Sequence, residues 1–448
     1  MSSSTLSVLL PSLSILILSI LSEATVPASK TFKFINEGSF SDGFYAPNEY
    51  NANYRTSNLR ALPFMLCFYN TTPNAYTLGL QMGYQPSDNP INFRWIWDAN
   101  RGNPVRENAV LAFGTDGNLV LTDANGKIAW QTGTSNKGVV GFQILPNGNI
   151  VLHDNRGRFV WQSFDHPTDT LLVGQGLRPG GPTGLVSRVS NVDGSAGPYS
   201  LVLEKDRMAL YLKSKNSPKP LLYYTTGENP PYQGSIPTSM VFNAVPANSD
   251  AAAYELRYEF QAESNWTSML ARPKYNSSFS FLRLESDGDL KIYTFYDKVD
   301  WSAWEVTYSL FGPKEGLDGG NECKLPKKCG SLGLCDKNQC VACPRPKGLK
   351  GWSESCQPPR LPHYKMRANN VDYYKVVGVE HFMSGYTEGE MPVKVTKCRE
   401  KCTLDCGCLA YFYEEESSKC LLAPELGTLS KVSNQSHVAY IKIPKYPK

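Results

Sequence analysis

The sequence predicts a mainly β protein in which two β-domains in tandem precede small cysteine-rich modules. Three observations favour this class. The chain has 36 Gly and 31 Pro among 448 residues, and the apolar runs between them are short, as in strands separated by turns. Tryptophans recur about every thirty residues near the N-terminus. Eleven of the twelve cysteines lie between Cys323 and Cys420, so disulfides can staple only the last part of the chain.

Residues 1–24 have the pattern of a secretory signal peptide. The stretch Leu6–Leu21 is apolar and serine-rich without charge, and small residues follow at Ser22 and Ala24. This core is too short to span a bilayer, and no later segment is apolar enough to anchor the chain. We therefore expect a secreted, extracellular protein without a membrane anchor. Its candidate N-glycosylation sites are the sequons at Asn70, Asn265, Asn276 and Asn434.

Repeated units that end in Trp organise residues 31–165. Trp97, Trp130 and Trp161 each close a short apolar strand, and the last two units are near copies, TDGNLVLTDANGKIAWQT and PNGNIVLHDNRGRFVWQS. A unit this short buries little surface alone, so we expect neighbouring units to share a core around the tryptophans. The pattern predicts an all-β domain with internal threefold pseudosymmetry.

A second domain of the same build is expected over residues 166–315. Its strand candidates are PYSLVLE, MALYLKS, AYELRYEF, SFSFLRLES and DLKIYTFYD. Trp301 follows Asp287 at the spacing that separates Trp130 from Asp116. We interpret this hairpin as a more decayed copy of the same repeat.

Six cysteines predict a small stapled module over residues 321–356. Their pattern, C-x5-C-x5-C-x4-C-x2-C-x12-C, would also suit zinc, but an oxidising compartment favours disulfides. We therefore expect three bonds among Cys323, Cys329, Cys335, Cys340, Cys343 and Cys356.

A second cysteine-rich module is expected over residues 357–446. Cys398 and Cys402 are four residues apart and project from one face of a short helix. Cys408 and Cys420 each begin a strand. The pattern predicts a helix cross-linked to a small sheet.

Together these segments resemble the plant S-locus glycoprotein architecture. The stretches that carry the resemblance are WIWDANRGNPV, DGNLVL, WQSFDHPTDTLL and CREKC-x3-C-x-C-x-AYFY. It implies tandem bulb-type (mannose-binding-type) lectin domains of the β-prism class, an EGF-like module and a PAN/apple domain. Further stretches, CFYNTTPNAYTLGL, TSNKGVVGFQILPNGN and KCLLAPELGTL, are similar to the secreted, kinase-less epidermis-specific glycoproteins.

The resemblance also implies two disulfides, Cys398–Cys420 and Cys402–Cys408. It implies a further cysteine shortly after the EGF-like module as the partner for the position of Cys406, but the segment QPPRLPHYKM has none. Cys406 and Cys67 are therefore left over. They pair with each other, bond to another chain or stay free.

The family's sugar site has the pattern Q-x-D-x-N-x-V-x-Y, in which the polar residues bind mannose hydroxyls and Val packs on the sugar ring. The first copy aligns Gly114, Asp116, Asn118, Val120 and Thr122 with this pattern, so it lacks the Gln and the Tyr. The second copy keeps only Asn149 and Val151, with other residues at Leu145, Asn147 and His153. The third copy has Glu285, Asp287, Asp289, Lys291 and Tyr293.

Each lost hydroxyl partner costs roughly 1 kcal/mol of binding. Asp-Gly and Asn-Gly also have a structural role, because they form tight hairpin turns. We therefore interpret both N-terminal copies as structural repeats in preference to working mannose sites. The candidate carbohydrate-binding residues are Asp116, Asn118, Val120, Asn149 and Val151. Any surviving pocket is expected around Asp116.

No motif for catalysis, metal or nucleic-acid binding is found. G-x-S-x-G, HExxH, P-loop and Rossmann patterns do not occur, and the net charge of +4 is spread without a Lys/Arg run. None of the five histidines has metal-ligand spacing: His153, His166, His363, His381 and His437. We predict no enzyme, no cofactor, no metal and no nucleic-acid partner.

The sequence thus predicts a secreted, N-glycosylated protein of the cell wall or apoplast that works by binding. Its lectin-like domains would bind mannose-type or other wall glycans, or protein partners, and its PAN module would mediate self-association or protein contact. One alternative is a structural protein of the epidermal wall without a specific ligand. Another is a soluble receptor-like decoy that pairs with the ectodomains of S-domain receptor kinases.

Overall fold

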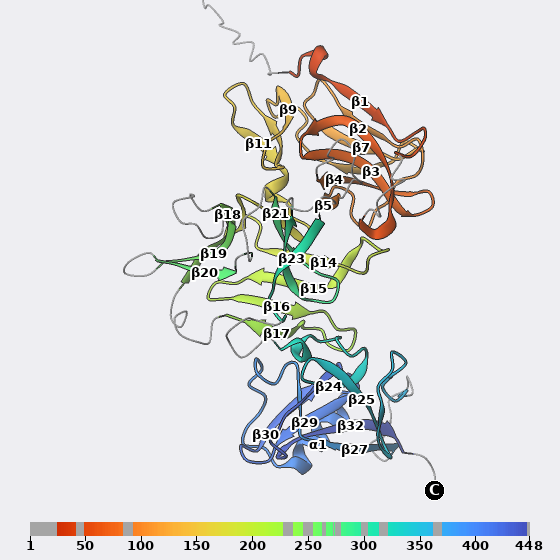
Figure 1. The fold of residues 1–448 in the computed structure, drawn as a ribbon, viewed down its shortest axis with the longest axis vertical. Helices are drawn as coiled ribbons and strands as arrows, with labels where there is room; N and C mark the ends of the chain where they lie inside the picture. The colour runs from red at the N-terminus through yellow and green to blue at the C-terminus, as the bar shows by residue number, and fades with distance from the viewer. Residues whose placement is uncertain are drawn as a thin grey trace, which may run out of the picture.

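The structure, a computed structural model, describes residues 25–41, 49–83, 93–226, 236–244, 254–261, 266–271, 273, 279–296, 303–312, 321–361 and 370–445. The signal-peptide residues 1–24, Trp301 and the sequons at Asn265 and Asn276 lie outside these ranges. The protein is mainly β and elongated, with the lectin-like domains at one end and the cysteine-rich part at the other (Figure 1). In the described part of the chain, no helix is long and apolar enough to cross a membrane.

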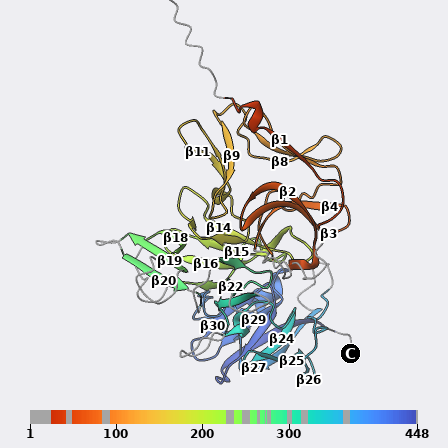
Figure 2. The ribbon, with the colours of Figure 1, turned by 45° about the horizontal axis from the view of Figure 1, so that its top comes forward.

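The first domain consists of three antiparallel sheets (Figure 2). The first sheet is β2 (Asn53–Ala61), β3 (Phe64–Thr72), β4 (Ala75–Met82) and β5 (Arg94–Asp98). The second has the order β1 (Phe32–Ile35), β6 (Val110–Phe113), β7 (Leu119–Thr122) and β8 (Ile128–Gln131). The third is β9 (Gly141–Ile144), β10 (Ile150–His153) and β11 (Phe159–Gln162). The two repeated sequences form the hairpins β7–β8 and β10–β11, one in each of the last two sheets.

Three tryptophans close the pseudosymmetric core of the first domain. The ring centroids of Trp97 and Trp130 are 5.8 Å apart, those of Trp130 and Trp161 are 5.8 Å apart, and those of Trp97 and Trp161 are 6.2 Å apart. All three pairs are edge-to-face, the arrangement that aromatic quadrupoles favour. The shared tryptophan core expected from the repeat is confirmed.

The second domain repeats this build. Its first sheet is β14 (Gly184–Arg188), β15 (Ala196–Leu203), β16 (Met208–Leu212) and β17 (Leu221–Thr225). Its second sheet is β13 (Gln175–Leu177), β18 (Ile236–Ala244), β19 (Tyr254–Gln261) and β20 (Trp266–Ala271). Its third sheet is β12 (Thr170–Leu172), β21 (Ser280–Leu284), β22 (Leu290–Tyr296) and β23 (Ala303–Ser309). Three consecutive strands, β12, β13 and β14, thus each join a different sheet.

The two lectin-like domains share a hydrophobic core. Phe281, Phe295 and Trp304 of the third sheet of the second domain belong to the same buried cluster as Leu80 and Leu121 of the first domain. This third sheet is therefore the layer on which the first domain rests.

The cysteine-rich part contains the only α-helix among the described residues, α1 (Val395–Leu404). One sheet has the order β26 (Gly348–Gly351), β25 (Gln339–Arg345), β24 (Leu332–Asp336), β31 (Gly427–Lys431) and β28 (Val379–His381). The other has the order β27 (Val371–Val377), β32 (His437–Pro444), β29 (Ala410–Glu414) and β30 (Lys419–Ala423). Short 3-10 turns complete the elements: η1 (Ala28–Lys30), η2 (Glu49–Asn51), η3 (Ser163–Asp165) and η4 (Glu322–Lys324).

The two cysteine-rich modules are joined by a shared sheet. Strand β24 of the first cysteine-rich module pairs in parallel with β31 of the second. The hydroxyl of Thr428 accepts a hydrogen bond from the backbone N–H of Cys329, and the hydroxyl of Ser430 donates to the carbonyl of Cys323. The two segments therefore form one folded body, an arrangement that their separate cysteine patterns do not reveal.

Five disulfides staple this part of the chain among the described residues: Cys323–Cys335, Cys329–Cys340, Cys343–Cys356, Cys398–Cys420 and Cys402–Cys408. The last two are the pairs that the resemblance implied. Cys67 and Cys406 are both free. Cys67 is buried in the first domain whereas Cys406 is exposed, so the two do not bond to each other in this structure.

Candidate functional site

In the first copy of the repeat, Asn118 is a cross-link within the hairpin. Its side chain is 7% exposed, and its amide nitrogen donates to Oε1 of Gln131 at 2.9 Å. Its amide oxygen accepts from the backbone N–H of Thr134 at 3.1 Å and from the hydroxyl of Thr132 at 3.0 Å. Because these bonds occupy the amide on both sides, Asn118 holds the two strands together and offers little to a ligand.

The second copy uses Asn149 in the same way. Its amide nitrogen donates to Oε1 of Gln162 at 2.8 Å, and its oxygen accepts from the N–H of Phe164 at 3.2 Å and the hydroxyl of Ser163 at 3.3 Å. The partner Gln directly follows the core Trp in both copies. The repeated Trp-Gln pair was thus the sequence signal for this bond, and reasoning from the sugar motif alone missed it.

Asp116 and Asn147 occupy equivalent turns, where each side chain accepts a backbone hydrogen bond two residues on. Oδ1 of Asp116 accepts from the N–H of Asn118 at 3.2 Å, and Oδ1 of Asn147 accepts from the N–H of Asn149 at 3.2 Å. Asp116 is exposed, and its second oxygen accepts from the hydroxyl of Ser135 at 2.7 Å. The two turns have the same internal hydrogen bond, so a difference in ligand binding must come from the carboxylate in place of the amide or from the surroundings of the two turns.

The strand face of the first copy is open, and we call Asp116, Val120 and Gln131 the first-copy face. Asp116 and Gln131 are exposed and Val120 is half-buried. Gly114 lies at the position of the motif Gln, and a Cβ there would approach Oδ1 of Asp116 to 2.8 Å. The loss of the Gln therefore leaves the Asp116 carboxylate in place at the surface.

The strand face of the second copy is closed. Val151, equivalent to Val120, is only 1% exposed. Its register partner Gln162 donates to Oδ2 of Asp165 at 2.9 Å, and Arg178 donates to Oδ1 of the same carboxylate at 3.2 Å. The chain after β11 thus folds back onto this face. Asn149 and Val151 are brought together with each other but are not accessible to a sugar.

The third copy faces the first domain. The Tyr293 hydroxyl donates to Glu285 at 2.8 Å, and the Tyr293 ring stacks on Phe281 with centroids 5.1 Å apart. The guanidinium groups of Arg94, from β5 of the first domain, and Arg283 each lie 5.8 Å from the centroid of the same ring. Burial raises the pKa of Glu285, which the neighbouring Arg283 partly offsets. This copy keeps polar residues at all five motif positions, yet it serves as a contact between domains.

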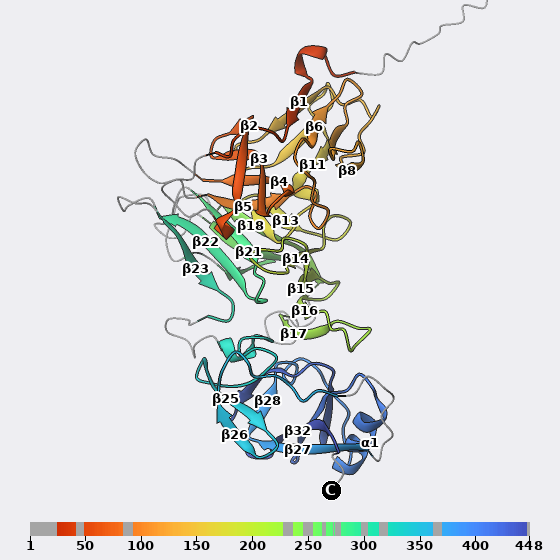
Figure 3. The same cartoon turned by 90° about the vertical axis from the view of Figure 1, so that its right-hand side faces the viewer.

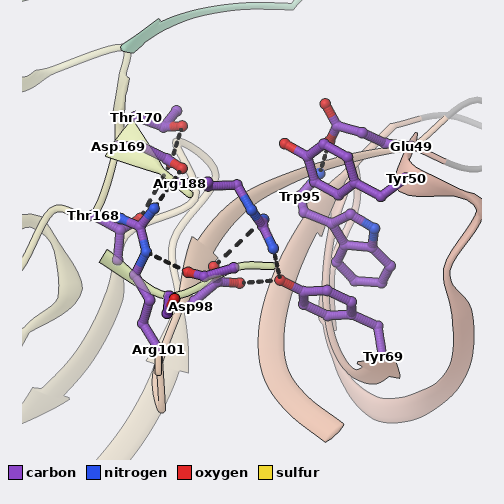
Figure 4. A network of polar contacts seen from close by, with 12 residues as sticks. Glu49, Tyr50, Tyr69, Trp95, Asp98, Arg101, Thr168, Asp169, Thr170 and Arg188 are labelled. Atoms are coloured by element: carbon purple, nitrogen blue, oxygen red, sulfur yellow. Dashed lines mark hydrogen bonds and ion pairs between the residues drawn. The ribbon is translucent and has the colours of Figure 1, made fainter. Parts of the chain in front are cut away.

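A buried network of charged groups continues this contact (Figure 4). Arg188 of β14 donates to the Tyr69 hydroxyl at 2.9 Å and lies 3.6 Å from Asp98, to which Tyr69 donates at 2.8 Å. Nearby, Arg101 pairs with Asp169 at 3.2 Å. The pairs made by Arg188 and by Arg101 each join a residue of the first domain to one of the second.

The network keeps its charges despite burial. Burial alone would lower the pKa of Arg188, but Tyr69 and Asp98 raise it well above its usual value. Burial alone would raise the pKa of Asp169, but Arg101, Arg283 and Arg188 lower it. Because paired buried charges are costly to separate, the network fixes the orientation of the two lectin-like domains.

The described histidines have structural surroundings. The ring of His166 stacks on Trp161, with centroids 5.4 Å apart. Burial lowers the pKa of His381 to about 3, and its ring lies 3.0 Å from the Glu425 carbonyl while accepting from the N–H of Met383. Among the described residues, no group of three or more His, Cys, Asp or Glu side chains is arranged to hold a metal ion.

The two described sequons differ in access. Asn70 lies in β3 with its side chain 3% exposed, so a glycan there would require the side chain to turn outward. Asn434 is half-buried in the turn before β32, where its side-chain oxygen accepts from the N–H of Ser436.

The fold and these sites define a class of protein, a tandem lectin-type β-prism with a disulfide-rich C-terminal part. Family models agree: the D-mannose binding lectin model matches residues 95–190, the S-locus glycoprotein domain matches residues 232–353, and the PAN-like domain matches residues 375–425.

Full-length relatives identify the family. EP1-like glycoprotein 2 of Arabidopsis thaliana is 46% identical over 446 residues, which cover 94% of this chain and 95% of the relative. The epidermis-specific secreted glycoprotein EP1 of Daucus carota is 51% identical over 355 residues, or 75% of this chain and 89% of the relative. The chain belongs to this EP1-like family of secreted, lectin-like glycoproteins.

A more distant relative shares only part of its length. A G-type lectin S-receptor-like serine/threonine-protein kinase of Arabidopsis thaliana is 25% identical over 78% of this chain, but the match covers 39% of the kinase.

Proposed function

We propose that this chain is a non-enzymatic binding protein of the plant cell wall or apoplast, and that its first-copy face holds a glycan. The observation that carries the proposal is the difference between the three copies of the sugar motif. In the second copy Val151 is buried under the chain after β11, and in the third Tyr293 contacts Arg94 of the first domain while Lys291 stands in place of the packing Val, whereas Asp116 is exposed beside the half-buried Val120. Two copies of the sugar motif therefore make contacts that stabilise the fold, and the first copy stays accessible.

The chemistry of the first-copy face fits a shallow, weak saccharide site. A carboxylate offers about four acceptor positions, and Asp116 uses one for Asn118 and one for Ser135. The others can accept sugar hydroxyls, while Val120 offers apolar surface to the ring. Each such hydrogen bond contributes only about 1 kcal/mol. Useful affinity would then come from many copies of the sugar along a wall polymer, through multivalency.

A matched pair of variants tests this proposal. Asp116→Ala and Asn147→Ala remove the same turn hydrogen bond, but Asp116 lies beside the half-buried Val120 whereas Asn147 lies beside the buried Val151. On a glycan array with the secreted mature protein, we expect Asp116→Ala to lose the signal and Asn147→Ala to keep it. Equal signals from both variants would contradict the proposal.

Asn118→Ala and Asn149→Ala are the folding controls. Each leaves buried hydrogen-bond partners without the amide, so each should lower the free energy of unfolding by about 1–3 kcal/mol. Because the two amides have equivalent partners, we expect similar losses of stability from both variants, measured by urea denaturation.

Binding to the ectodomains of S-domain receptor kinases is the second candidate function. It is favoured by the alignment of 78% of this chain with part of such a kinase. Capture of a kinase ectodomain without any glycan signal would favour this soluble-decoy role. If neither glycan nor kinase is bound, the result would favour a structural protein of the epidermal wall.

A further inference from the structure

The net charge of the chain belongs to its first cysteine-rich module. Residues 321–356 contain seven Lys or Arg and three Asp or Glu, so this module alone has a net charge of +4. The remainder of the chain contains 38 residues of each sign and is neutral. The positive charge is therefore not spread over the chain, as the lack of a Lys/Arg run suggested, but lies in one small folded unit.

Three of these cations lie together on the hairpin β25–β26. Arg345 ends β25, Lys347 is in the two-residue turn, and Lys350 lies on β26. Because Arg345 is opposite Gly348 and Cys343 is opposite Lys350, Arg345 and Lys350 are diagonal neighbours on the same face of the hairpin. All three cationic side chains are exposed, and no acidic group of the described residues pairs with any of them.

Strand β26 is the outer strand of its five-stranded sheet. In Figure 3, β25 and β26 lie along one side of the cysteine-rich part and α1 along the other. Residues opposite each other in an antiparallel pair alternate between hydrogen-bonded and non-hydrogen-bonded pairs. Pro344, opposite Leu349, has no N–H, and its carbonyl accepts from the Tyr374 hydroxyl at 3.3 Å, so this pair is a non-hydrogen-bonded one. The N–H and C=O groups of Leu349 and Gly351 are therefore directed away from β25.

The space beside this edge is open and the hairpin that presents it is rigid. A Cβ added to Gly351 would meet no atom within 4 Å. Leu349 is 61% exposed, on the face of the hairpin opposite to Lys350. Two disulfides, Cys329–Cys340 and Cys343–Cys356, fix β25 behind it. A preorganised edge of this kind loses little conformational entropy when a strand pairs with it.

We propose that Arg345, Lys347, Leu349, Lys350 and Gly351 form a docking edge for an extended, acidic polypeptide segment, which adds to the sheet as a further strand. We call these residues the β26 edge. Backbone hydrogen bonds to Leu349 and Gly351 would supply the pairing, as in β-strand addition. Acidic side chains on one face of the added strand would meet Lys350 and Arg345, and apolar side chains on its other face would pack on Leu349.

The charge of the β26 edge selects this class of partner. Lysines on an edge strand keep identical edges apart, because two copies would bring like charges together, so a second copy of this chain is disfavoured. A polyanion without a peptide backbone could meet the cations but could not use the free groups of Leu349 and Gly351. The inference is independent of the proposed function, since it concerns another module and another class of ligand.

A panel of synthetic peptides tests the β26 edge. The peptides have ten residues, with Val at alternate positions and Glu, Gln or Lys at the others, and their binding to the secreted mature protein is measured by fluorescence anisotropy. We expect the Glu peptide to bind, the Gln peptide to bind at least about tenfold more weakly, and the Lys peptide not to bind. The affinity for the Glu peptide should fall as the salt concentration rises.

Three single variants separate strand pairing from general charge. Lys350→Glu replaces attraction by repulsion and should weaken the Glu peptide at least about tenfold. Leu349→Pro removes one outward N–H and no ladder bond to β25, so it should weaken this peptide about fivefold. Lys337→Glu is the matched control, because Lys337 is exposed in the turn between β24 and β25 and its replacement changes the net charge equally. It should leave the affinity within about twofold.

The outcomes that overturn the inference are distinct. Equal losses in Lys350→Glu and Lys337→Glu would show that only the net charge of the module matters, and this comparison holds even where Leu349→Pro fails to fold. An oligouronate of the same charge that binds as tightly as the Glu peptide would show a polyanion site without strand pairing. Absence of any binding by the Glu peptide also overturns the β26 edge. None of these results bears on the glycan signal of Asp116→Ala, so the proposed function stands or falls separately.

Discussion

Before residue 313 the chain has one cysteine, Cys67, whereas ten of the eleven cysteines between Cys323 and Cys420 are in disulfides. The lectin-like region is held by hydrophobic clusters that cross the boundary between its two domains and by buried ion pairs such as Arg188–Asp98. The cysteine-rich region shares a large apolar cluster with the second lectin-like domain and adds smaller clusters built around sulfur atoms. A long β-rich segment can bury enough apolar surface to dispense with covalent links, but a short module cannot.

Reduction of the disulfides should produce the largest difference in stability between the two regions. Each disulfide contributes about 2–5 kcal/mol to a small module, so loss of five should unfold the cysteine-rich region. We expect the reduced and alkylated protein to yield, on limited proteolysis, a protected fragment that ends near residue 312. The oxidised protein under the same protease is the control. Loss of protection across the whole chain would show that the lectin-like region depends on the disulfides as well.

Removal of one buried guanidinium should weaken the lectin-like region instead. Arg283 pairs with Glu49 and donates to the carbonyl of Trp95, and its side chain is 2% exposed. In Arg283→Met the buried Glu49 carboxylate loses the positive charge of Arg283. We therefore expect the free energy of unfolding, measured by urea denaturation, to fall by about 3–5 kcal/mol. Arg158→Met is the control, because the Arg158 side chain is 71% exposed and its pair with Asp154 should contribute less than about 1 kcal/mol. Equal losses from both variants would show that the domain contact is not held by this charge.

The smallest expected effect, taken over a single pH unit, is a pH dependence in the cysteine-rich region. Burial lowers the pKa of His381 to about 3 from 6.5, so the unfolded chain binds a proton that the folded chain does not. The stability is therefore full above pH 6.5 and falls as the pH drops towards 3, by up to about 1.4 kcal/mol per pH unit. His381→Gln should flatten this slope, measured as urea midpoints over that range. An unchanged slope in His381→Gln would assign the pH dependence to other groups.

The sequence predicted the features that have local signatures. The spacing of Trp97, Trp130 and Trp161 indicated the repeated hairpins, and cysteine spacing together with the resemblance indicated the stapled modules. The mainly β class follows directly from these signals. Phe281, which completes the core of the first domain, and the parallel pairing of β24 with β31 have no local signal. Both join segments that lie far apart in the chain.

The candidate site could be predicted only in part for the same reason. The motif pointed to Asp116, which is exposed, as the place where any pocket survives, and the pocket itself stays a prediction. It placed Val120 and Val151 in equivalent positions, although one is half-buried and the other is covered by the chain after β11. Access depends on what folds over a strand, and a nine-residue pattern contains no such information.

Because the two lectin-like domains share a core, the first domain cannot complete its core until most of the second domain has been synthesised. Phe281, Phe295 and Trp304 complete the cluster to which Leu80 and Leu121 belong. When the first domain leaves the ribosome, this apolar surface has no cover, and it stays exposed until some 140 further residues have been added. A chain interrupted within the second domain would thus present a hydrophobic face, which marks it for chaperones and quality control in the secretory pathway.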